Sequence, residues 1–196
     1  MNEANVPAPE AYYLPPTRYV PNSPLPLLVY RDVLPKPVTV ESSQRFVEQH
    51  GWDRKGHVWE AFYKRHFHPN SHECYGVVSG SSVVLMGAGT SDETEGRDPH
   101  DSTSKAVGIR LTLRQGDLII HPAGTSHANL STEGEYRYLA FFPRDAPRWR
   151  TENGTKLMDV EAIMSEIKAV PMPQDPVTGD SGHLQRLWGE AAKKSC

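Results

Sequence analysis

The sequence lacks the features that mark several broad classes of protein. It has two cysteines among 196 residues, and one of them, Cys196, is the last residue, so a disulfide framework is excluded. The other, Cys74, directly follows Glu73 in an expected strand, and alternation turns it to the opposite face. We expect Cys74 to be a buried structural thiol. No run approaches the roughly 18 apolar residues that a membrane-spanning helix needs.

An excess of either charge is also missing. The chain has 21 Lys and Arg against 24 Asp and Glu, and its net charge of −3 is too small and too evenly spread to favour nucleic acid or an anionic membrane. The N-terminal segment contains no positively charged stretch followed by an uninterrupted apolar one, which is the pattern of a secretory signal. We therefore expect a cytoplasmic protein with neither a nucleic-acid nor a membrane partner.

Length and the distribution of proline predict one domain in three parts. At 196 residues the chain has the size of a single domain. Nine of its 17 prolines precede residue 38, which favours extended backbone over helix in an N-terminal arm. We expect the arm and a short helix at 42–50 to occupy residues 1–57, a barrel core to occupy 58–145, and a helical segment to occupy 146–196.

The central part reads as a succession of short strands, as in all-β proteins. Turn-forming residues separate apolar runs, and the expected strands are 58–68, 73–79, 82–88, 106–114, 117–121, 126–131 and 135–142. In the clearest run the inward residues are Val107, Ile109, Leu111 and Leu113. The segment 89–105 is rich in Ser, Thr, Asp and Gly, which predicts an exposed loop.

Two helices are expected near the C-terminal end. Apolar residues recur at helical spacing within 156–169, and a second short helix is expected around Trp188. The first helix carries an expected packing stripe of Leu157, Val160, Ile163, Met164 and Ile167.

Two segments carry closely spaced histidines. Residues 66–80 read HFHPNSHECYGVVSG, and residues 116–127 read GDLIIHPAGTSH. On a strand, His66 and His68 lie on one face because side chains alternate with period two. A turn can then return Glu73 beside them, while His127 arrives from a distant strand. Imidazole and carboxylate together suit divalent Mn, Fe, Ni, Cu or Zn, which predicts a metal site.

These segments resemble the two motifs of the cupin superfamily, usually written G(x)5HxH(x)3–4E(x)6G and G(x)5PxG(x)2H(x)3N. The matching residues are His66, His68, Glu73 and Gly80 in the first motif and Gly116, Pro122, Gly124 and His127 in the second. Glu60 and Ser131 stand where the motifs have glycine and asparagine, and neither departure removes a ligand. The flanking segments are similar to the YjlB-like single-domain cupins of bacteria and fungi.

The resemblance implies an RmlC-like jelly-roll barrel with an extended N-terminal arm and short flanking helices. It also implies a divalent metal ion held by three histidines and one glutamate, with positions left open for a small-molecule substrate. The implied ligands are His66, His68, Glu73 and His127, and Glu73 could also detach to act as a base. Cupins of this type include dioxygenases, decarboxylases, isomerases and lyases, so we expect a metalloenzyme of one of these classes. The alternatives are a non-catalytic cupin that binds a small molecule or a sugar, and a sugar-nucleotide epimerase of similar fold, which would not need the complete metal set.

Alternation extends the expected site to neighbouring side chains. If His66 and His68 face the interior, Phe62 and Lys64 share their face, and Tyr75 shares the face of Glu73. As catalytic residues, Lys64 and Tyr75 can donate protons or hold a substrate carbonyl or carboxylate. Their other interpretation is structural, as a lysine at the barrel mouth and a core ring.

Several alternatives remain open. His72 in a regular strand points away from the metal as a turn histidine, whereas in an irregular turn it replaces His68 or Glu73 as a ligand. His121 faces either the pocket or the exterior of the sheet, and the loop 89–105 either closes over the site or does not. The apolar segment 25–34 is expected to form an added strand on its own domain or on a partner subunit. Because exposed edge strands invite aggregation, we predict a homodimer.

Overall fold

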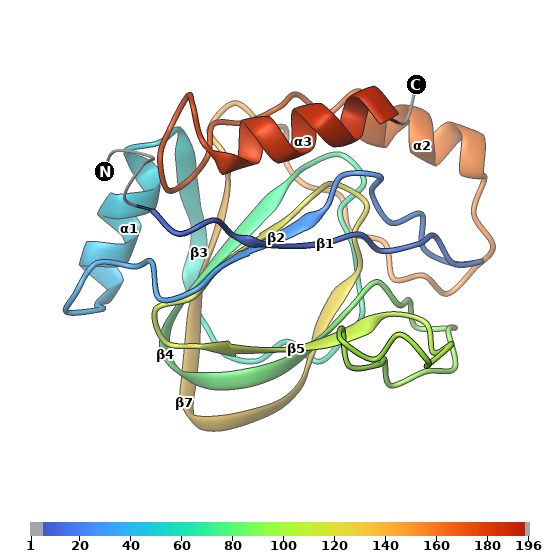
Figure 1. The fold of residues 1–196 in the computed structure, drawn as a ribbon, viewed down its shortest axis with the longest axis horizontal. Coiled ribbons are helices and arrows are strands. Elements are labelled where there is room, and N and C mark those ends of the chain that lie inside the picture. Colours follow the sequence, from blue (N-terminus) through green and yellow to red (C-terminus); the bar gives the residue numbers. More distant parts are fainter. Residues whose placement is uncertain (1–5, 195–196) are drawn as a thin grey trace.

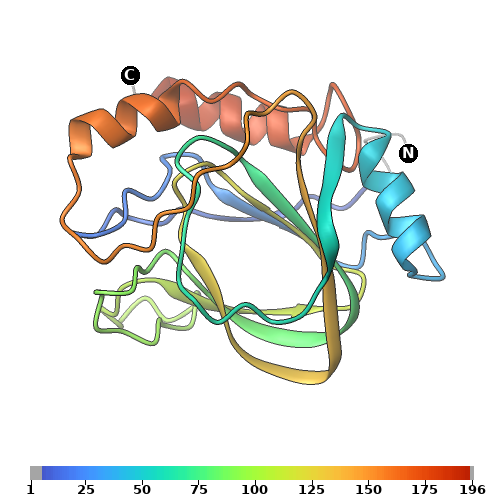
Figure 2. The same ribbon diagram turned by 180° about the vertical axis from the view of Figure 1, so that it is seen from behind.

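The structure is a computed structural model that describes residues 6–194, and it is a bent antiparallel sheet with helices along one side (Figure 1; from behind in Figure 2). The strands are β1 (Glu10–Tyr12), β2 (Leu27–Tyr30), β3 (Trp52–Trp59), β4 (Glu73–Met86), β5 (Ile109–Arg114), β6 (Leu118–His121) and β7 (His127–Pro143). Their spatial order is β1-β2-β6-β4-β7-β3, with β5 on β4. The predicted all-β jelly-roll class is confirmed, although the edges β1 and β3 are not joined among the described residues.

Two long strands, β4 and β7, shape the bent sheet. One edge of β4 pairs with β7 from Cys74 to Met86. Its other edge pairs with β6 over its first residues and with β5 from Ser81 onward. The prediction of four separate strands at 73–79, 82–88, 126–131 and 135–142 was therefore wrong, because each pair of short strands is one continuous bent strand.

Gly80 marks the bend, and its backbone explains why glycine stands there. Its φ is +63°, and an added Cβ would lie 2.7 Å from both the Glu133 carbonyl oxygen and the Tyr136 nitrogen. Both neighbours are backbone atoms on β7, so neither can move aside cheaply. Pairing between β4 and β7 shifts register around this residue. The glycine that looked like a turn signal is the site of a bulge within one strand.

We predict that Gly80→Ala is much more destabilising than Gly134→Ala. Gly134 also has a positive φ, +67°, but an added Cβ there would meet only the Cα of Gly80 at 3.6 Å. Gly134→Ala should lower the free energy of unfolding by about 1–2 kcal/mol, because alanine is disfavoured in left-handed backbone. Gly80→Ala should lower it by about 3 kcal/mol or more, because the steric clash adds to that cost. Urea denaturation measures both, and equal losses would contradict this explanation of the bend.

The two faces of the sheet pack into two apolar clusters. One lies between the sheet and the helices and includes Phe46 of α1 (Val40–Glu48) and Trp188 of α3 (His183–Lys194). The other fills the inside of the bend and includes Tyr75 and Tyr138. Cys74 is fully buried in the first cluster, as predicted for a structural thiol, while Cys196 lies outside the described residues. The side chains of adjacent β4 residues thus lie on opposite faces of the sheet, and only those on the inner face line the candidate site.

The predicted outer elements are present, with corrected bounds and contacts. The arm forms β1 and β2, and β2 pairs with β6 of the same chain, so this strand is added to its own domain. Helix α2 (Val160–Lys168) is shorter than predicted. Leu157 and Val160 are 66% and 59% exposed, so the N-terminal half of the expected packing stripe was wrong. The homodimer remains a prediction that light scattering tests.

Alternation in β5 is confirmed in its main part. Ile109, Leu111 and Leu113 are buried, whereas Val107 precedes the strand and is exposed.

The loop 89–105 is held against the chain before β4, since the Arg65 guanidinium donates hydrogen bonds to the carbonyl oxygens of Gly89, Asp92 and Thr94. Across residues 6–194, the helices are too short and too polar to cross a bilayer.

Candidate metal centre

Three separate segments bring the motif residues together. His66 pairs with His127 at the start of β7 through two backbone hydrogen bonds of 3.2 and 2.9 Å. The His68 carbonyl oxygen accepts a hydrogen bond of 2.8 Å from the Gly124 nitrogen, and Glu73 begins β4. All four side chains are at most 6% exposed. The two sequence motifs therefore meet at one buried centre, as the spacing of their histidines predicted.

The contacts of the histidine Nδ1 atoms leave a lone pair on each Nε2 atom, and the Nε2 atom of His127 also faces the Tyr75 hydroxyl at 3.1 Å. The Nδ1 atoms of His66 and His68 lie 2.9 Å from the carbonyl oxygens of Lys64 and Arg150, and that of His127 lies 3.2 Å from the Thr125 carbonyl oxygen. A carbonyl only accepts, so each Nδ1 carries the proton and each Nε2 carries a lone pair. Such contacts orient metal-binding histidines. One ligating atom from each of the three rings lies within 4.8 Å of the others.

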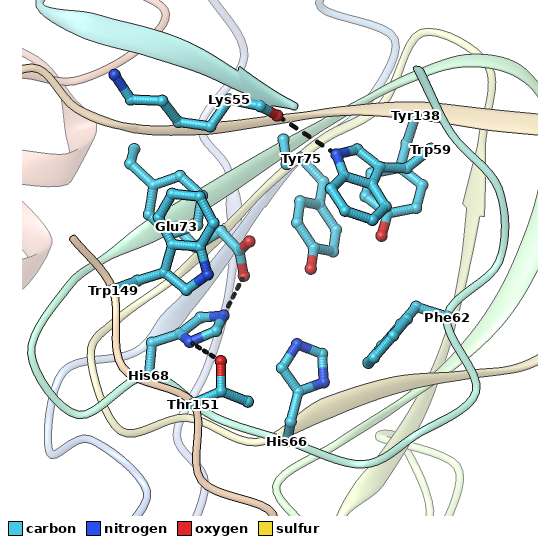
Figure 3. A pocket seen from close by; sticks show the side chains of 12 residues that line it. Lys55, Trp59, Phe62, His66, His68, Glu73, Tyr75, Tyr138, Trp149 and Thr151 are labelled. Carbon is cyan, nitrogen blue, oxygen red and sulfur yellow. Dashed lines mark hydrogen bonds and ion pairs between the residues drawn. The ribbon is translucent and has the colours of Figure 1, made fainter. Parts of the chain in front are cut away.

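Glu73 adds a carboxylate with an unsatisfied oxygen. Its Oε2 lies 3.1 Å from His127 Nε2 and 3.6 Å from His68 Nε2 (Figure 3 draws the His68 contact), yet it accepts no hydrogen bond. The carboxylate oxygen of Glu73 and the Nε2 lone pairs of His68 and His127 thus point at one another. Leaving a buried polar atom without a hydrogen bond is unfavourable. A divalent cation satisfies all of them at once, so the residues present fit a metal ion.

Burial sets the protonation state of this cluster. Desolvation lowers the pKa of His66 to about 4, with the neighbouring His127 acting in the same direction, and desolvation also lowers the pKa of His127 to about 4. The pKa of His68 is lowered for the same first reason, although the Glu73 carboxylate opposes it. Burial raises the pKa of Glu73, against the pull of the histidines. The imidazoles are therefore neutral at pH 7, the form that binds metal.

We predict that the metal-free protein loses stability as the pH falls from about 6.5 to about 4. In the unfolded chain the histidines take up protons near pH 6.5, whereas in the folded chain the pKa of His66 and of His127 is about 4. The unfolded state thus binds more protons in this window. The raised pKa of Glu73 makes the folded state bind more protons and so opposes this loss of stability, but Glu73 is one group and the histidines are several. Urea denaturation with chelator present should show the decline, and a constant free energy of unfolding would contradict it.

The candidate metal centre opens into a cavity of about 140 Å³. An engineered cavity that binds benzene has about 150 Å³, so this space suits a ligand of roughly one small ring. Aromatic side chains form most of its walls, as Figure 3 shows. The lining residues are Lys55, Trp59, Phe62, His66, His68, Glu73, Tyr75, Tyr138, Ala140, Phe142, Trp149 and Thr151.

Of the two proton donors expected beside the ligands, the structure brings one to the cavity. The Tyr75 hydroxyl lies 3.1 Å from His127 Nε2, and burial raises the pKa of Tyr75 well above its usual range. Tyr75 is therefore a protonated hydrogen-bond donor. The placement of Lys64 was wrong, because its side chain is exposed and does not line the cavity. The expected strand 58–68 ends at Trp59, so alternation could not carry Lys64 inward.

Of the two histidines whose direction the sequence left open, His72 faces away from the candidate metal centre and His121 faces it. His72 accepts a hydrogen bond of 2.9 Å from the Ala123 nitrogen, and its ring lies 4.7 Å from the Trp188 ring, toward α3. Burial lowers the pKa of His72 to about 3. His121 faces the interior, with its ring stacked on His127 at 4.3 Å. The loop 89–105 contributes no residue to the cavity lining.

Several cavity residues escaped prediction from the sequence. Tyr138, Ala140 and Phe142 alternate along β7, and this signal within the expected strand 135–142 would have found them. Trp149 and Thr151 follow β7 in a segment without regular structure. The Trp149 ring stacks on Phe142 at 4.3 Å, a contact that only the folded chain creates.

Comparison with known proteins supports the family indicated by the motifs. No family model matches the chain. The chain is 26% identical over 183 residues to the uncharacterized protein YjlB of Bacillus subtilis, across 91% of this chain and 96% of that protein. It is also 30% identical over 115 residues to an acireductone dioxygenase of Phaeosphaeria nodorum, across 58% of each.

Solved structures give looser likenesses. RmlC of Streptococcus suis aligns with a TM-score of 0.36 and 11% identity, over 74% of this chain and 73% of that one. An oxalate decarboxylase of Lactobacillus farciminis aligns with a TM-score of 0.33 and 12% identity, over 75% of this chain but only 34% of that one. With both motifs converging on one buried centre inside an antiparallel sheet, the chain resembles the cupin superfamily.

Proposed function

We propose that this chain is a metal-dependent enzyme that acts on a small organic molecule inside the barrel, with dioxygenase chemistry as the leading class. The observation that supports this most is the placement of the His66, His68 and His127 imidazoles and the Glu73 carboxylate beside an open cavity. The proposed site binds one divalent ion through these four residues. Similarity to an acireductone dioxygenase supports the oxygenase class over decarboxylase, isomerase or lyase chemistry.

A divalent ion would supply Lewis-acid polarisation of a substrate oxygen and would hold reactants together. The chain's own residues then determine which molecule fits. Phe62, Phe142 and Trp149 surround the centre with apolar rings that exclude water and favour a flat body. The Tyr75 hydroxyl beside His127 can donate a hydrogen bond to a substrate oxygen. We therefore propose a substrate of about ring size that presents oxygen atoms to the ion.

The test compares reaction classes on one preparation. Protein loaded in turn with Fe, Mn, Ni, Cu or Zn is supplied with small enediols, 1,3-dicarbonyls and oxo acids while oxygen, carbon dioxide and products are measured. Oxygen consumption with cleavage of one substrate would support the dioxygenase. Carbon dioxide release or isomerisation without oxygen uptake would select the other classes. A bound ion without turnover would overturn the enzyme in favour of a binding protein, and His127→Ala is the matched control.

A further inference from the structure

His121, the last residue of β6, is a buried imidazole whose ring nitrogens have no hydrogen-bond partner among the described residues. Its side chain is 2% exposed, and neither Nδ1 nor Nε2 has a hydrogen bond within the described chain. A neutral imidazole presents one donor and one acceptor, so burying both unpaired is unfavourable. His72, equally buried, does have a partner in the Ala123 nitrogen. The unsatisfied nitrogens of His121 therefore require an explanation that the fold does not supply.

The position of His121 points to the metal centre. It lies directly opposite Glu73 in the β4–β6 register, and residues opposite each other in an antiparallel pair share a face. Its ring stacks on His127 at 4.3 Å with an interplanar angle of 26°. One ligating atom from each of Glu73, His121 and His127 lies within 4.8 Å of the other two. This group overlaps the one formed by His66, His68 and His127 but is distinct from it.

We propose that Glu73, His121 and His127 form a second, inner set of metal ligands, and that His121 is a metal-binding residue. The inference rests on the metal-binding part of the proposed function. His127 belongs to both sets, and its Nδ1 already contacts the Thr125 carbonyl oxygen, so only its Nε2 can bind. The two sets thus compete for one ion. The unsatisfied Oε2 of Glu73 supplies the negative charge that an inner ion needs.

A consequence follows for the binding of substrate. A molecule that takes the place of His66 or His68 on the ion would leave the inner ligands in contact with it. The competing explanation is a buried water between His121 and Glu73, which would satisfy the same atoms without binding metal.

The test removes the outer ligands and asks whether the inner ones still bind. Metal-free wild type, the double variant His66→Leu/His68→Leu and a triple variant that adds His121→Leu are titrated with Co²⁺, followed by visible absorption and by elemental analysis after dialysis. Leucine removes the ligating nitrogen and keeps much of the volume. The double variant should bind one ion per chain, more weakly than wild type. The triple variant should bind at least about 100-fold more weakly again, since even residues that only support metal ligands contribute 10–100-fold.

Other results would separate the two proposals. Wild type that binds Co²⁺ beside a double variant that does not would overturn the inner set and leave the proposed function standing. A triple variant that binds as well as the double would show that His121 is not a ligand. Wild-type protein that does not bind Co²⁺ would contradict both the inner ligand set and the proposed metal-dependent function. Circular dichroism checks folding, and the pair His66→Ala/His68→Ala with and without His121→Ala repeats the comparison if the leucine variants do not fold. Electron paramagnetic resonance of Cu²⁺ on the double variant should lose one imidazole coupling after His121→Leu.

Discussion

Replacing His127 by alanine should weaken binding of a divalent ion more than replacing either His66 or His68. His127 belongs to both groups of side chains that could hold a metal ion, so its loss leaves neither complete. We expect the affinity of the His127→Ala protein for the ion to fall by more than about 100-fold, since residues that merely support metal ligands already contribute 10–100-fold. Isothermal titration calorimetry on metal-free protein measures the three variants side by side.

His72→Ala is the control, because His72 is as buried as His127 but lies against Ala123 and Trp188. It should lower the free energy of unfolding by about 1–3 kcal/mol through its lost hydrogen bond and packing. Its affinity for the ion should nevertheless match that of wild type. If His72→Ala lost the ion as completely as His127→Ala, general damage to the fold would explain both results.

Glu73→Gln should have opposite effects on the metal-free and the metal-loaded protein. Without an ion, the buried Glu73 carboxyl faces the Nε2 lone pairs of His68 and His127, and burial raises the pKa of Glu73 because ionising it there is costly. A glutamine amide offers N–H donors to those lone pairs, so the free energy of unfolding should rise by about 1–2 kcal/mol. With an ion, the lost negative charge should weaken binding by at least about 10–100-fold.

Urea denaturation with chelator and with saturating ion measures both effects. The ion stabilises wild type by about 2.7 kcal/mol when its concentration is 100 times the dissociation constant, and the variant should gain much less at that concentration. Glu60→Gln is the matched control, since Glu60 is an exposed carboxylate paired with Arg137. It should change neither measurement. A Glu73→Gln protein that is destabilised without an ion would contradict the interpretation that Glu73 and the histidines are placed together to hold a metal ion.

The sequence was enough to predict that the candidate ligands lie together, because their spacing is tied to backbone geometry. His66 and His68 need only the period of an extended chain, and the motif glycines need only a backbone that other residues adopt poorly. Gly124 illustrates this, since its φ is +84° and an added Cβ would lie 2.4 Å from the Ile167 side chain. Such local requirements leave a trace in the sequence. The fold class followed from them together with the alternation of the strands.

Features that depend on contacts between distant segments could not be predicted from local sequence patterns. Lys64 was misplaced because alternation was extended beyond Trp59, where β3 ends. Trp149 reaches the cavity from a segment with no periodic pattern, by stacking on Phe142. Gly80 carries the same signal in a turn and in a bulge, so one bent strand was predicted as two. His121 was left undecided because its side chain direction depends on the β4–β6 register, which joins residues far apart in the chain.

The most direct test of a metal centre in this barrel is elemental analysis of protein purified without added metal, with wild type beside His68→Ala/His127→Ala. The structure predicts about one divalent ion per wild-type chain and none in the double variant, because that substitution leaves both ligand groups incomplete. The identity of the ion would then choose the reaction to screen, with iron directing the search to oxygen uptake. Wild type that contains no ion, and takes up none on reconstitution, would contradict the metal centre and leave a barrel that binds its ligand through side chains alone.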